Sequence, residues 1–94
     1  MKKEFYIIEA DYTDDKELFK INPNLSYLFF VDFDYENKEV FYTKSVKYAR
    51  QFPNYESAYL TVMYLSHSAR KSKYYILNIN ENNGNYNLIS KSLI

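Results

Sequence analysis

The charged side chains of Val31–Phe52 change sign along the chain. An acidic group comes first, made of Asp32, Asp34, Glu36 and Glu39, and a basic group of Lys44, Lys47 and Arg50 follows, with aromatic residues between them. Carboxylates in a row attract cationic partners, whereas Lys and Arg interleaved with aromatic rings can hold phosphates and stack bases. The stretch therefore offers two candidate binding surfaces of opposite charge.

The acidic group is predicted to lie on a β-strand. Tyr27–Tyr35 alternates, which predicts Tyr27, Phe29, Val31, Phe33 and Tyr35 on one face and Leu28, Phe30, Asp32, Asp34 and Glu36 on the other. Carboxylates on one strand face stand about 6.6–6.8 Å apart and repel, so water or a partner must relieve them. We expect Glu9 and Asp11 on a neighbouring strand, and Glu17 beside it, to widen this surface. The predicted partner-binding residues are Asp11, Asp14, Asp15, Asp32, Asp34, Tyr35, Glu36 and Glu39.

Such a surface could occupy a groove lined by Lys and Arg, as nucleic-acid mimics do. The simpler interpretation is the solvated side of a one-sided antiparallel sheet.

The basic group is the alternative surface. Lys44, Lys47 and Arg50 recur at three-residue spacing, so one side of a short helix could present all three. The predicted nucleic-acid-binding residues are Lys44, Lys47, Arg50, Arg70, Lys71 and Lys73. The net charge is zero and nucleic-acid binders are usually basic overall, so this surface ranks second.

Catalysis has little support in the sequence. The single histidine, His67, is flanked by Ser66 and Ser68, which point to different sides of a helix, and its place at a helix end suits the helix dipole. An all-oxygen Mg²⁺ site from Asp14–Asp15 with Asp32 and Asp34 is conceivable, but nothing fixes its geometry. The only glycine is Gly84, so no glycine loop cradles a phosphate. We predict no catalytic residue, metal or cofactor, and therefore a non-enzymatic domain.

Composition predicts one folded domain over residues 1–94, because 47% of the residues are hydrophobic. The absence of cysteine fits a reducing cytoplasm, and no apolar run reaches the about 20 residues that span a bilayer. Acids interrupt the N-terminal stretch MKKEFYIIEADY, which argues against a signal peptide. Residues 1–40 hold ten acids and five lysines (−5), and residues 41–94 hold two acids and seven bases (+5). This asymmetry either draws the two halves together or steers a partner.

Hydrophobic periodicity predicts seven elements. Strands are expected at Phe5–Tyr12, Tyr27–Tyr35, Glu39–Thr43, Tyr74–Asn80 and Tyr86–Ser90, and helices at Ser45–Phe52 and Tyr55–Arg70. Residues 13–24 read as a connector. In the second helix, Ala58, Val62, Leu65 and Ala69 form a sheet-facing stripe that Tyr55, Tyr59 and Met63 broaden. The order β-β-β-α-α-β-β predicts an α+β domain, a mostly antiparallel sheet with two helices packed on one face.

Lys, Asn, Ile and Tyr are abundant while Gly, Ala, Pro and Trp are scarce, which is typical of an AT-rich genome. A short, cysteine-free chain of this composition resembles the small accessory proteins of phages and mobile elements in low-GC bacteria, anti-CRISPR-like inhibitors among them. The resemblance is to a class and is carried by size and composition. It implies a host protein partner, such as a nucleic-acid-binding effector, in the cytoplasm of a bacterial host.

Twelve tyrosines favour a protein partner over a small-molecule pocket, because tyrosine is a common interface residue. Some of them, such as Tyr35, Tyr42, Tyr48 or Tyr64, are expected at the surface. The sequence thus predicts a protein-binding inhibitor that uses an acidic, tyrosine-rich surface.

Overall fold

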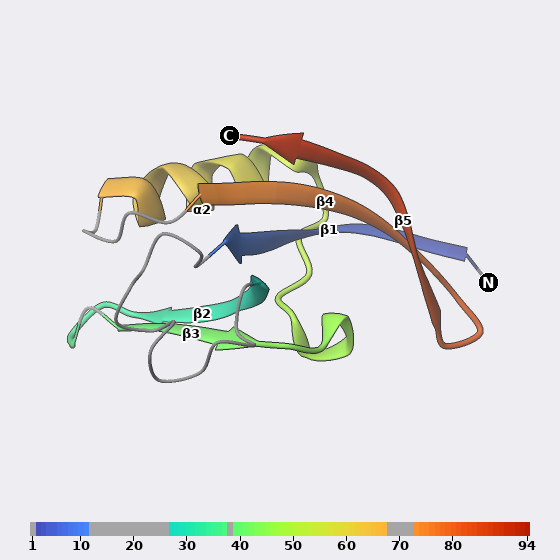
Figure 1. Cartoon of the computed structure of the whole chain (residues 1–94), viewed down its shortest axis with the longest axis horizontal. Coiled ribbons are helices and arrows are strands. Elements are labelled where there is room, and N and C mark those ends of the chain that lie inside the picture. The colour runs from blue at the N-terminus through green and yellow to red at the C-terminus, as the bar shows by residue number, and fades with distance from the viewer. Residues whose placement is uncertain (1, 12–26, 38, 68–72) are drawn as a thin grey trace.

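The computed structural model describes residues 2–11, 27–37, 39–67 and 73–94 (Figure 1). The strands are β1 (Lys2–Asp11), β2 (Tyr27–Asp34), β3 (Glu39–Thr43), β4 (Lys73–Asn82) and β5 (Asn85–Leu93). A 3₁₀ turn, η1, spans Val46–Tyr48, and the α-helix α2 spans Tyr55–His67. The α+β class is confirmed, and the order within the described residues is β-β-β-α-β-β.

The described strands form one antiparallel sheet in the order β3-β2-β1-β4-β5. β1 lies at its centre and pairs with β4 along its whole length, from Lys2 opposite Asn82 to Asp11 opposite Lys73. β4 and β5 are joined by the two residues Asn83 and Gly84, which have φ angles of 52° and 81°. Asn-Gly is the pair that tolerates two left-handed positions in a tight hairpin, so this turn follows from the sequence.

α2 begins where the sequence predicts. The Asn54 side chain accepts a hydrogen bond from the Ser57 backbone N–H at 2.8 Å and so caps the helix. Ala58, Val62 and Leu65 are fully buried against the sheet, as predicted. The three residues expected to broaden this stripe, Tyr55, Tyr59 and Met63, are instead exposed, and Ala69 lies outside the described residues.

The helix predicted at Ser45–Phe52 is wrong. Only Val46–Tyr48 turns, and the chain is extended from Ala49, whose ψ is 149°. The Arg50 N–H bonds the Phe30 carbonyl at 2.9 Å, and Phe52 exchanges two backbone hydrogen bonds of 2.8 and 2.9 Å with Tyr6. An isolated helix of eight residues is marginal, so pairing with two strands prevails.

The alternation predicted for Tyr27–Tyr35 is also wrong beyond Phe30. On β2 the ladder passes from Phe30 opposite Tyr42 directly to Asp32 opposite Phe41, so Val31 is an extra, bulged residue. The extra residue shifts the strand by one position relative to the alternation that the sequence predicts. Phe30 and Phe33 therefore share the core beneath α2, whereas the predicted alternation placed them on opposite faces of the strand.

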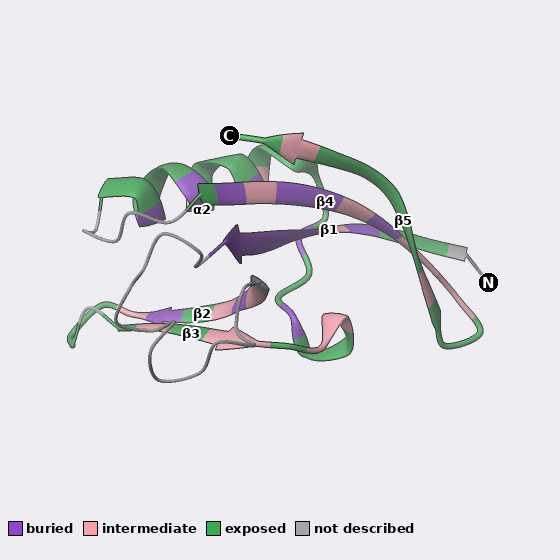
Figure 2. Ribbon diagram, viewed as in Figure 1, coloured by how far each residue is buried: buried purple, intermediate pink, exposed green. Residues whose placement is uncertain are grey.

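The sheet buries apolar side chains on both faces of its central strands. Ile8 and Ala10 belong to the core that includes α2, and the alternate residues Phe5 and Ile7 belong to a second core. Ala49 belongs to that second core and Phe52 to the core beneath α2, so the segment predicted as a helix on one face contributes to both faces. Figure 2 shows the buried residues concentrated on β1 and β4.

The core beneath α2 can be tested at Val62, whose side chain is fully buried. Val62→Asp would bury an unpaired carboxylate at a cost of several kcal/mol, a large share of the about 5–15 kcal/mol that holds a domain folded. We expect loss of the cooperative thermal transition in circular dichroism. Leu60→Asp, the same change at an exposed position of the same helix, should melt as the wild type does. Equal melting of both variants would contradict this helix orientation.

Candidate functional site

A hollow of about 340 Å³ lies between β2 and α2. Its apolar wall is formed by Phe30, Phe52 and Leu65, which belong to the core. Its rim carries Tyr35, Leu60 and Tyr64, and two charged side chains, Asp32 and Arg50, also line it. These residues come from β2 and the residue directly after it, from the segment after η1 and from α2, so only folding brings them together.

Three aromatic rings contact one another at this rim. The Phe33 ring lies edge-on to Tyr35 at 5.0 Å and to Tyr64 at 5.2 Å between centroids, and Tyr35 and Tyr64 lie 5.5 Å apart. Phe33 is buried, whereas Tyr35 and Tyr64 are 71% and 47% exposed. Neighbouring Leu60 is 68% exposed. The cluster therefore fixes two tyrosines in place while leaving much of their surface in water.

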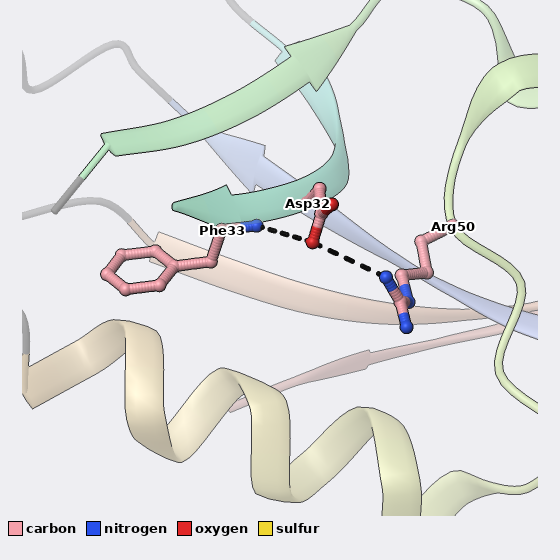
Figure 3. Close-up of polar contacts among 3 residues, drawn as sticks. All are labelled: Asp32, Phe33 and Arg50. Carbon is pink, nitrogen blue, oxygen red and sulfur yellow. Dashed lines mark hydrogen bonds and ion pairs between the residues drawn. The ribbon is translucent and has the colours of Figure 1, made fainter. Parts of the chain in front are cut away.

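Asp32 and Arg50 meet at the polar side of the hollow (Figure 3). The Asp32 Oδ1 accepts the Phe33 N–H at 2.8 Å and Arg50 Nη1 at 3.4 Å. Both side chains are more than half exposed, at 64% and 54%. The Phe33 contact orients the carboxylate, whereas the exposed and long contact with Arg50 contributes little stability.

The end of the β2–β3 hairpin carries the other described acids of the predicted surface. Asp34 stands directly opposite Glu39, and Glu36 and Glu39 are exposed. Asp34 accepts hydrogen bonds from the Asn37 side-chain nitrogen at 2.8 Å and from the N–H groups of Glu36 at 3.0 Å and Asn37 at 3.3 Å. These bonds, that from the Asn37 side chain foremost, lower the pKa of Asp34. Asp34 thus shapes the turn, and Glu36 and Glu39 provide the accessible charge.

The remaining acids of the predicted surface lie elsewhere. Asp11 is buried at 8% exposure and faces Lys73 across the β1–β4 ladder, and Asp14 and Asp15 lie outside the described residues. Glu9, expected to widen the surface, is also buried and bonds Lys91 at 3.1 Å. The structure therefore brings together Asp32, Asp34, Tyr35, Glu36 and Glu39, on one hairpin.

The basic set is dispersed among the described residues. Lys44 and Lys47 are exposed near η1, and the Lys47 ammonium lies 5.8 Å from the Tyr48 ring centre. Arg50 pairs with Asp32, and Lys73 begins β4 on the other side of β1. Arg70 and Lys71 lie outside the described residues. Because no helix forms at Ser45–Phe52, the three-residue spacing of Lys44, Lys47 and Arg50 gives no common helix side.

Within the described part of the chain, Ser66 and His67 at the end of α2 make no hydrogen bond with each other that would activate a serine nucleophile. The Ser66 hydroxyl donates to the Val62 carbonyl one turn earlier at 2.9 Å, and His67 is the exposed last residue of the helix. Among the described residues, no group of three potential ligands is placed to hold a metal ion. Nor does the described part of the chain contain a helix of the length and apolarity that crossing a membrane requires.

Sequence reasoning missed three residues of this site: Phe33 and Leu60 were not expected there, and Tyr64 was expected only to be exposed. The predicted alternation placed Phe33 on the wrong face of the strand, because it did not include the bulge at Val31. A signal for the helix residues existed: Leu60 and Tyr64 are spaced four apart, on a side of the helix that does not include Ala58 and Val62.

Neither protein-family models nor searches of curated proteins and of solved structures give a match to this chain. The site must be interpreted from its own chemistry.

The hairpin turn should respond to the ionisation of Asp34. Because folding lowers the pKa of this carboxyl from 3.8, the turn is stabilised above pH 3.8 and loses that contribution as pH falls through the lower folded pKa. We expect the amide signals of Glu36 and Asn37 to move together in an NMR titration, with a midpoint below 3.8. Asp34→Asn keeps an acceptor oxygen and should remove the transition. A midpoint at or above 3.8 would show that the turn does not favour the ionised form.

Proposed function

We propose that this chain is a protein-binding domain that acts through the aromatic rim of the hollow and the adjacent acidic hairpin end. This surface, the hairpin–helix surface, consists of Asp32, Tyr35, Glu36, Glu39, Leu60 and Tyr64. The observation that carries the proposal is the exposure of Tyr35 and Tyr64, which their ring contacts with Phe33 hold in place beside a hollow.

The exposed side chains of this surface favour contact with a protein over contact with water. Tyr35, Leu60 and Tyr64 expose large apolar areas next to one another, and contiguous exposed apolar patches mark protein-binding surfaces. Tyrosines that packing already restrains lose little further conformational freedom on binding. The patch therefore has the composition and rigidity of an interface centre.

The charges indicate a basic partner. Glu36 and Glu39 are exposed at the hairpin end and carry negative charge that a partner can reach, whereas Asp34 is hydrogen-bonded within the turn. A cationic partner would gain electrostatic steering from these two carboxylates. Asp32 extends the acidic character to the hollow, where Arg50 offsets part of it.

A partner with a groove lined by Lys and Arg meets both requirements, and such grooves are the surfaces that nucleic-acid-binding proteins offer to phosphates. On this basis we propose inhibition of a nucleic-acid-binding protein as the biological role. The local charge argues against direct nucleic-acid binding by the hairpin–helix surface, because phosphates would be repelled there.

Selection from a displayed random-peptide library tests this function directly, because it requires no identified partner. We expect enriched peptides with net positive charge and large apolar side chains. Tyr35→Ser/Tyr64→Ser should weaken their binding about tenfold or more, because each buried interface tyrosine contributes over about 1 kcal/mol. Tyr48→Ser, at another highly exposed tyrosine outside the hollow, is the matched control and should bind as the wild type does.

The proposal fails if no peptide is enriched or if the double variant binds the enriched peptides as tightly as the wild type. A gel shift of single-stranded DNA or RNA at low salt that Lys47→Glu removes would support nucleic-acid binding in its place.

A further inference from the structure

We infer that the hollow between β2 and α2 is an anchor site for an arginine side chain of the partner, with its guanidinium seated between Asp32 and the rings of Tyr35 and Tyr64. This inference rests on the proposed function and specifies the chemistry of the contact.

The Asp32 carboxylate supplies the acceptor. Its Oδ1 holds the Phe33 N–H and the Arg50 guanidinium, and among the described residues Oδ2 has no hydrogen-bond partner. Figure 3 shows the carboxylate between β2 and Arg50, on the side of the strand that looks toward α2. An oriented carboxylate with an unused oxygen is suited to the paired N–H groups of a guanidinium.

The aromatic rim supplies the second contact. Tyr35 and Tyr64 line the same hollow as Asp32, and their centroids are 5.5 Å apart at an interplanar angle of 59°. Rings set at an angle leave a face or an edge open to a planar cation, which the ring quadrupole attracts. A volume of about 340 Å³ accommodates a side-chain guanidinium and its methylene stem.

Arg50 shows that a guanidinium reaches Asp32. Its Nη1 lies 3.4 Å from Oδ1 with both side chains largely in water, so the contact is easily exchanged. Arg50 therefore competes with the partner's arginine for the Asp32 carboxylate. The partner's arginine either replaces Arg50 there or binds the same carboxylate beside it. Lysine is a poorer ligand, because an ammonium cannot bind Asp32 in a bidentate manner or stack flat on a ring.

The test is an NMR titration of the intact ¹⁵N-labelled protein with Nα-acetyl-arginine amide. The matched probes are Nα-acetyl-citrulline amide, which has nearly the same shape without the charge, and Nα-acetyl-lysine amide. We expect saturable shifts at the amides of Asp32, Phe33, Tyr35 and Tyr64 with arginine, weaker shifts with lysine and none with citrulline.

Two variants give opposite expected changes. Asp32→Asn keeps an oxygen for the Phe33 N–H but removes the charge, and should abolish arginine binding. Arg50→Gln removes the competitor and should tighten binding about two- to fivefold, the amount by which an exposed ion pair is typically favourable. The backbone bond from Arg50 to Phe30 does not depend on the side chain, so the fold should persist. Glu4→Gln, the loss of one exposed charge on β1 that belongs neither to the hollow nor to the hairpin–helix surface, should leave binding unchanged.

The anchor is overturned if arginine gives no saturable shift, if citrulline binds as well, if Asp32→Asn binds normally, or if Arg50→Gln weakens binding. Library peptides that need Tyr35 and Tyr64 but not Asp32 would overturn the anchor and leave the protein-binding function standing. Loss of both responses would remove both proposals.

Discussion

Arg50–Phe52 inserts between β1 and β2, and the site is built around this insertion. Phe52 exchanges two backbone hydrogen bonds with Tyr6 of β1, and Arg50 donates one to Phe30 of β2. These bonds satisfy polar groups of two strands where their direct ladder, Glu9–Asp11 with Tyr27–Phe29, does not continue. The same three residues place the Phe52 ring 6.3 Å from Phe30 in the core and the Arg50 guanidinium beside Asp32.

The hollow is a consequence of this insertion together with the bulge at Val31. The bulge turns Phe33 toward α2, where the ring contacts Tyr64, and Tyr35, just after the strand, packs against the same ring. Bulges redirect side chains and occur often near functional sites. One extra residue in β2 thus creates the three-ring cluster, and α2, fixed by its buried stripe, provides the facing wall.

The described acids of the N-terminal half occupy different environments. Glu9 is buried and forms an ion pair with Lys91, whose ammonium also lies 4.3 Å from the Tyr75 ring centre. The Glu9 carboxylate is therefore engaged within the sheet. Asp34 is hydrogen-bonded within the hairpin turn. Glu36 and Glu39 are exposed, and Asp32 is held beside Arg50. A charge count along the chain therefore overstates the negative surface open to a partner, because burial and local hydrogen bonds engage several of these carboxylates.

Elements with strong local signals could be predicted from the amino-acid order. The bounds of β3, the Asn83-Gly84 turn, the Asn54 cap and the buried stripe of Ala58, Val62 and Leu65 follow from turn chemistry, capping and periodicity within a few residues. Only the folded chain reveals the bulge at Val31, the extended course of Arg50–Phe52 and the meeting of Asp32, Tyr35 and Tyr64. Each of these depends on hydrogen bonds or packing between segments far apart in the chain. The secondary-structure propensity of neighbouring residues does not predict such contacts.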